Sequence, residues 1–244
     1  MMRNVFIIIA VIFSIPNVFG QKTYERDTIP TTGGNLVITF IGHASLLFNY
    51  QERNIYIDPV SRVADFAAFP KADAILITHE HGDHLDPDAI QQLSKPGTEV
   101  YLNELSKKKV PAGKAYANES FFIAAGVPVE VMPAYNILNT RGNGLPYHPK
   151  GDGNGYILAF GKTRVYVAGD TEQIPEMAKK FKDIQIAFLP ISEPYTMPVY
   201  YAAEVAKLLK PSIVYPYHMN QASPEQLKEF LKGTGIEVRI RSLK

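Results

Sequence analysis

Short apolar runs rich in β-branched residues dominate this 244-residue chain from about Leu36 onward. They follow one another at roughly ten-residue spacing and are separated by Gly, Asn, Asp and Pro, which is typical of strands joined by turns. The first five runs cover residues 36–42, 45–50, 54–60, 74–79 and 99–103. Such a pattern predicts a fold built around β-sheets.

Helical signals are interleaved with these strands. Asp86 suits the N-cap of a helix, Pro87 its first position and Asp88 its first turn. Further helices are predicted over residues 174–183, 199–210 and 223–233, and residues 236–243 alternate as an edge strand does. A strand-rich part followed by helices, and then the same again, predicts an α/β fold of two packed sheets with helices outside, built from two similar halves.

The N-terminus resembles a secretory signal peptide. Arg3 precedes an apolar run from Val5 to Ile15, and cleavage is expected after Gly20. The run is shorter than the ~20 residues of a membrane span, so an uncleaved anchor is the alternative. We therefore expect a signal peptide over residues 1–20, a lead segment over 21–35 and one domain over 36–244. The mature protein is expected to be periplasmic or secreted, without stable membrane insertion.

Composition narrows the possible partners. The chain has no cysteine, which excludes disulfides, thiolate metal sites and a lipoprotein attachment cysteine. Its 25 basic and 24 acidic residues give a formal charge of +1, without a basic patch for nucleic acid. A small molecule is the expected partner, and the oligomeric state stays open.

Three of the six histidines lie in the stretch ILITHEHGDHLD, residues 75–86. His79 and His81 can point the same way if the chain is extended there, whereas Asp83 and His84 can diverge from them. Gly82 was expected to permit a tight turn between the two pairs. Imidazole and carboxylate suit zinc and similar ions, and two ligand pairs suit two ions ~3.5–4 Å apart. Histidines of an ordinary polar surface loop would not need this spacing.

This stretch resembles the histidine motif of the metallo-β-lactamase-fold hydrolases. Other stretches resemble that family in the same order: FIGHASLLF at 40–48, IYIDPV at 55–60, VYVAGDT at 165–171 and IVYPYH at 213–218. The resemblance extends from about Leu36 to the end and is closest to small metal-dependent hydrolases related to lactonases and phosphodiesterases. It implies a four-layer αβ/βα sandwich.

The resemblance also implies a ligand set. His79 and His81 would bind a first ion, Asp170 would bridge, and the second ion would be held by Asp83, His84 and His218. Taken alone, Asp170 could be a helix N-cap and His218 a core histidine. The implied cofactor is a pair of divalent ions, zinc foremost, with manganese or iron as alternatives.

One departure concerns the first ion. Many relatives carry another histidine where Asn136 stands here, and asparagine is a poor zinc ligand. His148 lies in the long irregular stretch 136–155 and could complete the first site, contact substrate or merely anchor the loop.

Four further residues are expected near the pocket. His43 and Asp58 are candidates for orienting a ligand or facing substrate. Tyr135 and Tyr195 are candidate substrate contacts, with ordinary packing at the rim as the alternative.

The predicted function is metal-dependent hydrolysis of an ester, lactone or phosphodiester. Two ions sharing a water would supply hydroxide, and Asp83 or Asp170 would guide the proton of that water. A β-lactamase is the alternative among enzymes. A non-catalytic metal-binding or sensing module on the same fold is the alternative outside them.

Overall fold

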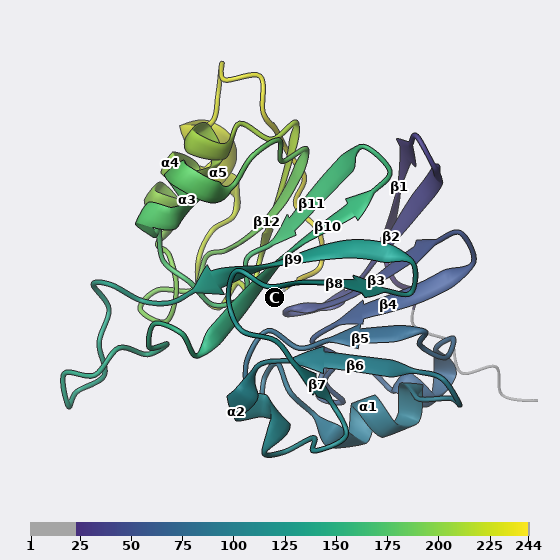
Figure 1. Ribbon diagram of the computed structural model, residues 1–244. Coiled ribbons are helices and arrows are strands. Elements are labelled where there is room, and N and C mark those ends of the chain that lie inside the picture. Colours follow the sequence, from purple (N-terminus) through teal and green to yellow (C-terminus); the bar gives the residue numbers. More distant parts are fainter. Residues whose placement is uncertain (1–22, 244) are drawn as a thin grey trace, which may run out of the picture.

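Two seven-stranded sheets face each other in the computed structural model, which describes residues 23–243 (Figure 1). The strand order is β1 to β7 in the first sheet and β14 to β8 in the second. The predicted signal peptide lies outside the described residues. No helix among residues 23–243 is long and apolar enough to cross a membrane.

The first sheet combines four antiparallel strands with three parallel ones. Its strands are β1 (Arg26–Thr31), β2 (Gly34–Gly42), β3 (Ser45–Tyr50), β4 (Arg53–Ile57), β5 (Ala74–Leu76), β6 (Glu99–Leu102) and β7 (Lys114–Ala115). Strands β1 to β4 pair antiparallel, and β5, β6 and β7 are added in parallel beyond β4.

The second sheet repeats this pairing pattern. Its strands are β8 (Phe121–Ala124), β9 (Val127–Ala134), β10 (Gly153–Phe160), β11 (Thr163–Val167), β12 (Ile186–Pro190), β13 (Ile213–Tyr217) and β14 (Glu237–Val238). Strands β8 to β11 pair antiparallel, and β12, β13 and β14 follow in parallel. The two halves therefore share one architecture, as the order of strand and helix signals predicts.

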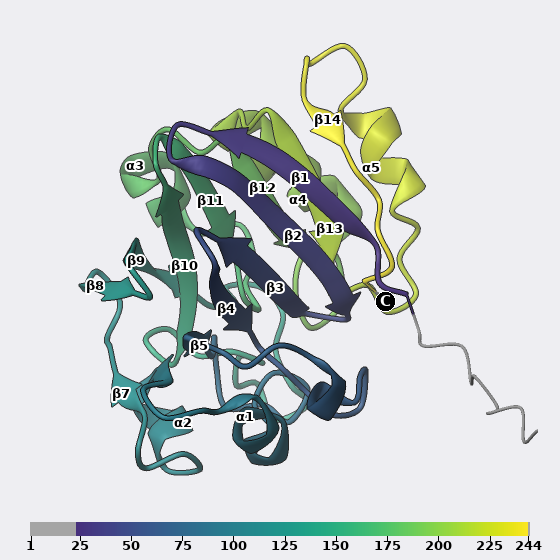
Figure 2. The same ribbon diagram turned by 90° about the vertical axis from the view of Figure 1, so that its right-hand side faces the viewer.

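Helices cover the outer faces of both sheets (Figures 1 and 2). The 3-10 helix η1 (Phe66–Ala68), α1 (Pro87–Leu93) and α2 (Glu104–Lys107) flank the first sheet, and α3 (Pro175–Lys180), α4 (Val199–Leu209) and α5 (Glu225–Phe230) flank the second. Asp86 caps α1 as predicted, because its carboxylate accepts from the backbone N–H of Asp88 and Ala89. The result is the predicted four-layer αβ/βα sandwich.

The main core lies between the two sheets. Phe40 and Phe48 of the first sheet pack against Phe188 of the second, with ring centroids 6.4 and 6.0 Å apart. Phe188 in turn stacks on Tyr215 at 4.8 Å. Burial of these large rings removes much apolar surface from water, which favours a close and rigid contact between the halves.

Strand β1 belongs to the first sheet, although it lies in the segment predicted as a lead. Its Asp27 accepts hydrogen bonds from Tyr215 at 2.5 Å and from Arg241 at 2.8 Å, which ties β1 to the second half. The sheet thus begins before Leu36. The predicted edge strand over residues 236–243 is shortened to β14, and Arg239 and Arg241 beyond it form ion pairs with the same carboxylate, Asp27.

Candidate metal centre

The candidate site lies where strands from both sheets end. His43 follows β2, Asp58 follows β4 and the histidine motif follows β5, all in the first half. Asp170 follows β11 and His218 follows β13 in the second half. Parallel strands place their carboxyl ends at one edge of a sheet, and the facing sheets bring these two edges together.

The motif loop is turned by its own backbone. The carbonyl of His81 accepts hydrogen bonds from the N–H of His84 at 3.0 Å and of Leu85 at 2.8 Å. Gly82 does not have a positive φ, and a Cβ added there would meet open space. The chain does turn at Gly82 as expected, but the turn does not depend on the conformational freedom of glycine; its hydrogen bonds separate the two ligand pairs.

Imidazole and carboxylate groups converge in three overlapping groups, in each of which the candidate ligand atoms lie within 4.8 Å of one another. The first group contains His79, His81 and His148, and the second contains Asp83, His84 and His218 together with His43. The third joins His79 and His84 to Asp170. All the residues predicted as ligands from the sequence are thus brought together.

The carboxylate of Asp170 lies between the first two groups. Its Oδ2 lies 3.3 Å from His148 Nε2 and 3.4 Å from His218 Nε2, and its Oδ1 lies 3.3 Å from His84 Nε2. A carboxylate that contacts ligand atoms of two neighbouring groups has the arrangement of a bridging ligand.

Buried polar atoms in this cluster lack hydrogen-bond partners among the described residues. They are His79 Nε2, His84 Nε2, Asp170 Oδ1 and both ring nitrogens of His218. Buried polar atoms normally have partners, since desolvating them without one costs free energy. Several unpartnered nitrogen and oxygen atoms directed at common points fit divalent ions, for which imidazole and carboxylate are suitable ligands.

Asp58 fixes the orientation of two histidines from behind. Its carboxylate lies 2.8 Å from His84 Nδ1 and accepts from the N–H of Thr78 at 2.7 Å and from its hydroxyl at 2.6 Å. The Thr78 hydroxyl lies 3.0 Å from His79 Nδ1. Both rings therefore turn Nδ1 toward Thr78 and Asp58 and direct Nε2 into the cluster, which places Asp58 where an orienting role was predicted.

His148 reaches into the cluster from the long loop. Its Nδ1 lies 2.7 Å from Asn136 Oδ1, and its Nε2 lies 3.2 Å from His81 Nδ1. The side-chain amide nitrogen of Asn136 donates hydrogen bonds to the carboxylate of Glu172 and to the backbone carbonyl of Tyr195. Asn136 is thus a support for His148, and His148 occupies the third position of the first group.

Burial and neighbouring charges set the protonation states. Burial lowers the pKa of His79 well below its usual value and that of His148 to about 4, so both rings are neutral and able to bind a cation. Burial raises the pKa of Asp170, but His218 and His84 outweigh it and hold this pKa well below its ordinary value. Burial likewise opposes ionisation of Asp83, but its pKa is lowered by the neighbouring imidazoles of His218, at 3.5 Å, and His43, at 3.2 Å.

Three residues of the cluster adopt left-handed backbone conformations. The φ angles are 53° at His43, 43° at Asp58 and 50° at His218. Such angles cost free energy in residues other than glycine and persist where the surroundings enforce them. These strand ends are held in geometries that serve the site.

The two tyrosines predicted to contact substrate, Tyr135 and Tyr195, lie in different surroundings. Tyr195 lies at the rim, 44% exposed, with its ring against Tyr147. Tyr135 donates its hydroxyl to Glu176 at 2.8 Å, and Lys150 lies over its ring. The described contacts therefore do not place the Tyr135 hydroxyl among the ligand atoms.

Sequence reasoning missed Thr78, Glu172 and Arg141. Glu172 accepts hydrogen bonds from the N–H of Ile137, Leu138 and Asn139 at 2.7–2.8 Å, and so anchors the loop that carries His148. Only its closeness to Asp170 in the sequence could have indicated it. Thr78 immediately precedes the motif, which was the available signal for that residue.

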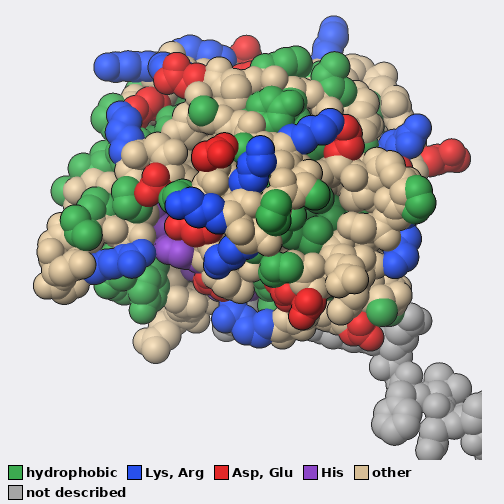
Figure 3. All heavy atoms as spheres, turned by 60° about the horizontal axis from the view of Figure 1, so that its bottom comes forward, with side chains coloured by type: hydrophobic (Ala, Val, Ile, Leu, Met, Phe, Trp, Pro, Cys, Tyr) green, Lys and Arg blue, Asp and Glu red, His purple; other side chains and the backbone are tan. Residues whose placement is uncertain are grey.

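The cluster reaches the surface on one face. His81 is partly exposed, and the side chain of Asp83 is 33% exposed, whereas the other ligand candidates are buried. Figure 3 shows histidine atoms at the surface between charged side chains, with apolar side chains to their left. A substrate would approach from this face.

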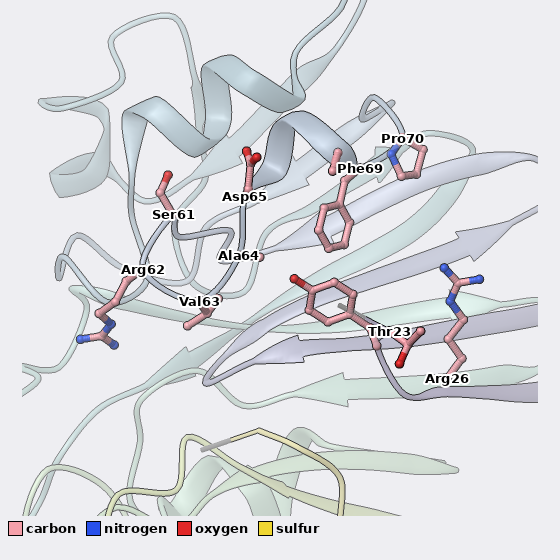
Figure 4. Close-up of a pocket in the computed structure, with 11 residues that line it drawn as sticks. Thr23, Arg26, Ser61, Arg62, Val63, Ala64, Asp65, Phe69 and Pro70 are labelled. Atoms are coloured by element: carbon pink, nitrogen blue, oxygen red, sulfur yellow. The ribbon is translucent and has the colours of Figure 1, made fainter. Parts of the chain in front are cut away.

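A separate hollow lies elsewhere. It has a volume of about 870 Å³ and is lined by the segment after β4 and the start of β1. Figure 4 shows Arg26 and Arg62 on opposite sides of it and Phe69 in its wall. None of its lining residues belongs to the histidine cluster.

Comparison with known proteins gives consistent relatives. The family model of the β-lactamase superfamily domain matches residues 37–218. A UPF0173 metal-dependent hydrolase of Nanoarchaeum equitans is 31% identical over 214 residues, which cover 83% of this chain and 95% of the relative.

Solved structures agree with this result. A protein of Parabacteroides distasonis described as a metal-dependent hydrolase is 50% identical, with a TM-score of 0.87 over 91% of this chain and 100% of its own. A metallo-hydrolase of Ignicoccus hospitalis has the same fold, with a TM-score of 0.68 at 24% identity over 85% of this chain and 95% of its own. The chain therefore belongs to the β-lactamase superfamily and is a metal-dependent hydrolase of the metallo-β-lactamase fold.

Proposed function

We propose that this protein hydrolyses an ester, lactone or phosphodiester bond with two divalent ions. The position of the Asp170 carboxylate carries the proposal, because it contacts His148 of the first group and His84 and His218 of the second. The Nε2 atoms of His84 and His218 have no hydrogen-bond partner among the described residues. Such a double site fits two-ion hydrolysis better than a single structural ion.

The residues divide between the two ions as the groups divide. His79, His81 and His148 would hold the first ion. Asp83, His84 and His218 would hold the second, and Asp170 would contact both. His43 Nε2 lies 3.2 Å from Asp83 Oδ2 and can orient that carboxylate.

When bound, divalent ions lower the pKa of a coordinated water and polarise the bond under attack. Asp83 or Asp170 would guide the proton of the attacking water through a hydrogen bond, and Asp83 is the one that is partly exposed on the substrate side. Asp58 and Asn136 keep the rings of His84 and His148 oriented, which preserves the geometry between turnovers.

Zinc is the proposed ion, with manganese and iron as alternatives. The donor set consists of five imidazoles and two carboxylates, which zinc accepts readily. We also propose that the mature protein acts in the periplasm or outside the cell, on the basis of the signal-like first twenty residues.

Metal analysis combined with an activity screen tests the hydrolytic function. The purified protein should carry up to two ions and cleave at least one substrate among lactones, carboxylic esters, phosphodiesters and phosphonates. Chelation and Asp170→Ala should each lower kcat by about 10³-fold or more, because both remove the groups that stabilise developing charge. Asp183→Asn, an exposed substitution in the loop after α3 that tolerates the local backbone, is the control.

Two results would contradict the proposal. One is a protein purified under mild conditions without bound metal. The other is hydrolysis that persists at the wild-type rate in Asp170→Ala.

A further inference from the structure

Arg141 lies at the tip of the loop between β9 and β10, beside the exposed face of the cluster. Its guanidinium donates to the carbonyl of Tyr147 at 2.9 Å, and its Nη2 lies 3.4 Å from His81 Nε2. Figure 1 shows this loop extending from the edge of the second sheet. The sequence offered no motif around Arg141, so only the fold brings it to the site.

The orientation of the His81 ring decides whether Arg141 can donate a hydrogen bond to it. His81 directs Nδ1 toward His148 Nε2, 3.2 Å away, and thus toward the first candidate ion. An imidazole that binds a cation through Nδ1 carries its remaining proton on Nε2. Arg141 Nη2 and His81 Nε2 would then both be donors, so they cannot hydrogen-bond to each other.

Two converging donors with a positive charge form a favourable position for an acceptor. Among residues 23–243, no carboxylate forms an ion pair with Arg141, whose exposed guanidinium contacts the Tyr147 carbonyl and His81. A guanidinium and an imidazole N–H that meet at one point are suited to an oxygen of a carboxylate or phosphate.

The loop holds Arg141 in place before any ligand arrives. Its backbone N–H donates to the carbonyl of Leu145 at 2.7 Å, and its carbonyl accepts from Gly144 at 2.8 Å. At the base of the loop, Asn136 donates its N–H to the carbonyl of His148 at 2.8 Å. A prearranged cation loses less entropy on binding an anion than a free one does.

We propose that Arg141 and the Nε2–H of His81 bind an anionic oxygen of the substrate, so that the substrate class carries a carboxylate or phosphate group next to the scissile bond. This inference rests on the proposed hydrolytic function for its biological meaning, but the anion site can be tested independently.

Titration of the metal-loaded protein with inorganic phosphate, followed by calorimetry, tests the site. Arg141→Ala should weaken phosphate binding by about tenfold or more, since one charge-assisted hydrogen bond is lost. Arg141→Lys should recover part of the loss, because lysine keeps the charge but not the planar fork. Arg53→Ala, which removes an exposed arginine paired with Asp73, is the matched control and should bind as the wild type does.

A parallel titration with acetate separates the two sources of the anion. A larger effect of Arg141→Ala on phosphate indicates a phosphate group, and a larger effect on acetate indicates a carboxylate; both support the inference. Equal binding of both anions by Arg141→Ala and the wild type overturns it. Failure of the wild type to bind either anion also overturns it, as does loss of metal in Arg141→Ala, which would make Arg141 a support for His81.

The result is separable from that of the hydrolysis screen. Binding that depends on Arg141, without hydrolysis of any tested substrate, would remove the proposed function and leave the anion site. Hydrolysis that is lost in Asp170→Ala, together with anion binding that does not depend on Arg141, would support the proposed function and remove the anion site.

Discussion

At the scale of single residues, the site depends on polar atoms that never touch the candidate ions. Asp58 binds the Nδ1 side of His84, Thr78 binds that of His79, and Asn136 binds that of His148. Each histidine thereby presents a fixed nitrogen to the cluster, and a free ring would lose this orientation.

Asp58→Asn is the most direct test of this support. The carboxylate has three donors directed at it, and an amide must turn its NH₂ toward one of them. Asparagine tolerates the left-handed backbone at this position, so the substitution changes the hydrogen bonds with little added strain. We expect metal affinity to fall by about 10–100-fold in competition with a chelator.

Asp88→Asn provides the comparison, because Asp88 is exposed in the first turn of α1. Unchanged metal affinity in Asp58→Asn would show that the ring of His84 is held by other contacts.

At the scale of elements, the first strand is bound to the last residues of the chain. Asp27 of β1 is bound by Tyr215, Arg239 and Arg241. Burial raises the pKa of Asp27, but hydrogen bonds from Tyr215 and Arg241 outweigh it, so the pKa lies below its ordinary value.

Asp27→Asn should therefore destabilise the protein in a pH-dependent way. A carboxyl with a lowered folded-state pKa stabilises the fold fully above its unfolded pKa of about 4, and this contribution is lost as the pH falls through the folded value. We expect Asp27→Asn to cost about 1 kcal/mol at neutral pH, because the arginines are partly exposed, and progressively less below about pH 4. Urea unfolding of the wild type and of Asp27→Asn, at neutral pH and below about pH 4, measures this difference in unfolding free energy. Asp183→Asn is the control. A cost that is constant across this range would contradict the assignment.

How much the sequence reveals differs between local and long-range contacts. The N-cap of α1 was predicted correctly because the capping hydrogen bonds of Asp86 come from residues two and three positions away. The helix predicted over residues 223–233 begins later, with Pro224 at the N-cap of α5, and the hydroxyl of Ser223 donates to the Glu225 side chain. The contacts of Arg239 and Arg241 with Asp27 could not be foreseen, since they join residues more than two hundred positions apart.

The same distinction applies to the site. The motif at 79–84 is continuous, so its ligand character is visible in the chain. The direction of His148 depends on Asn136 and on the anchor at Glu172, and no local pattern records those contacts. The choice between His148 and Asn136 therefore needed the fold.

At the scale of the whole molecule, the site connects the two halves. His79, His81, Asp83 and His84 come from the first half, and His148, Asp170 and His218 come from the second. A ligand that binds only the folded state stabilises it by mass action, and here it would also hold the sheets together.

Metal removal should consequently lower the melting temperature. At a free metal concentration of about 100 times Kd, one ion contributes about 2.7 kcal/mol, and each kcal/mol shifts Tm by roughly 2–4 °C in a chain of this size. We expect a fall of roughly 5–10 °C per ion on chelation, measured by calorimetry. In His81→Ala the fall should be smaller, because less metal is bound beforehand; equal melting temperatures with and without chelator in the wild type would argue against ions at this interface.

The anchoring of the long loop has a consequence for how this protein could be altered. Glu172 and the pairing of Asn136 with His148 secure the base of the loop, while residues 140–146 turn back on themselves at its tip. We therefore expect that the sequence of the tip can be redesigned to change ligand preference. His148, at the base of the loop, should keep its position during such a change.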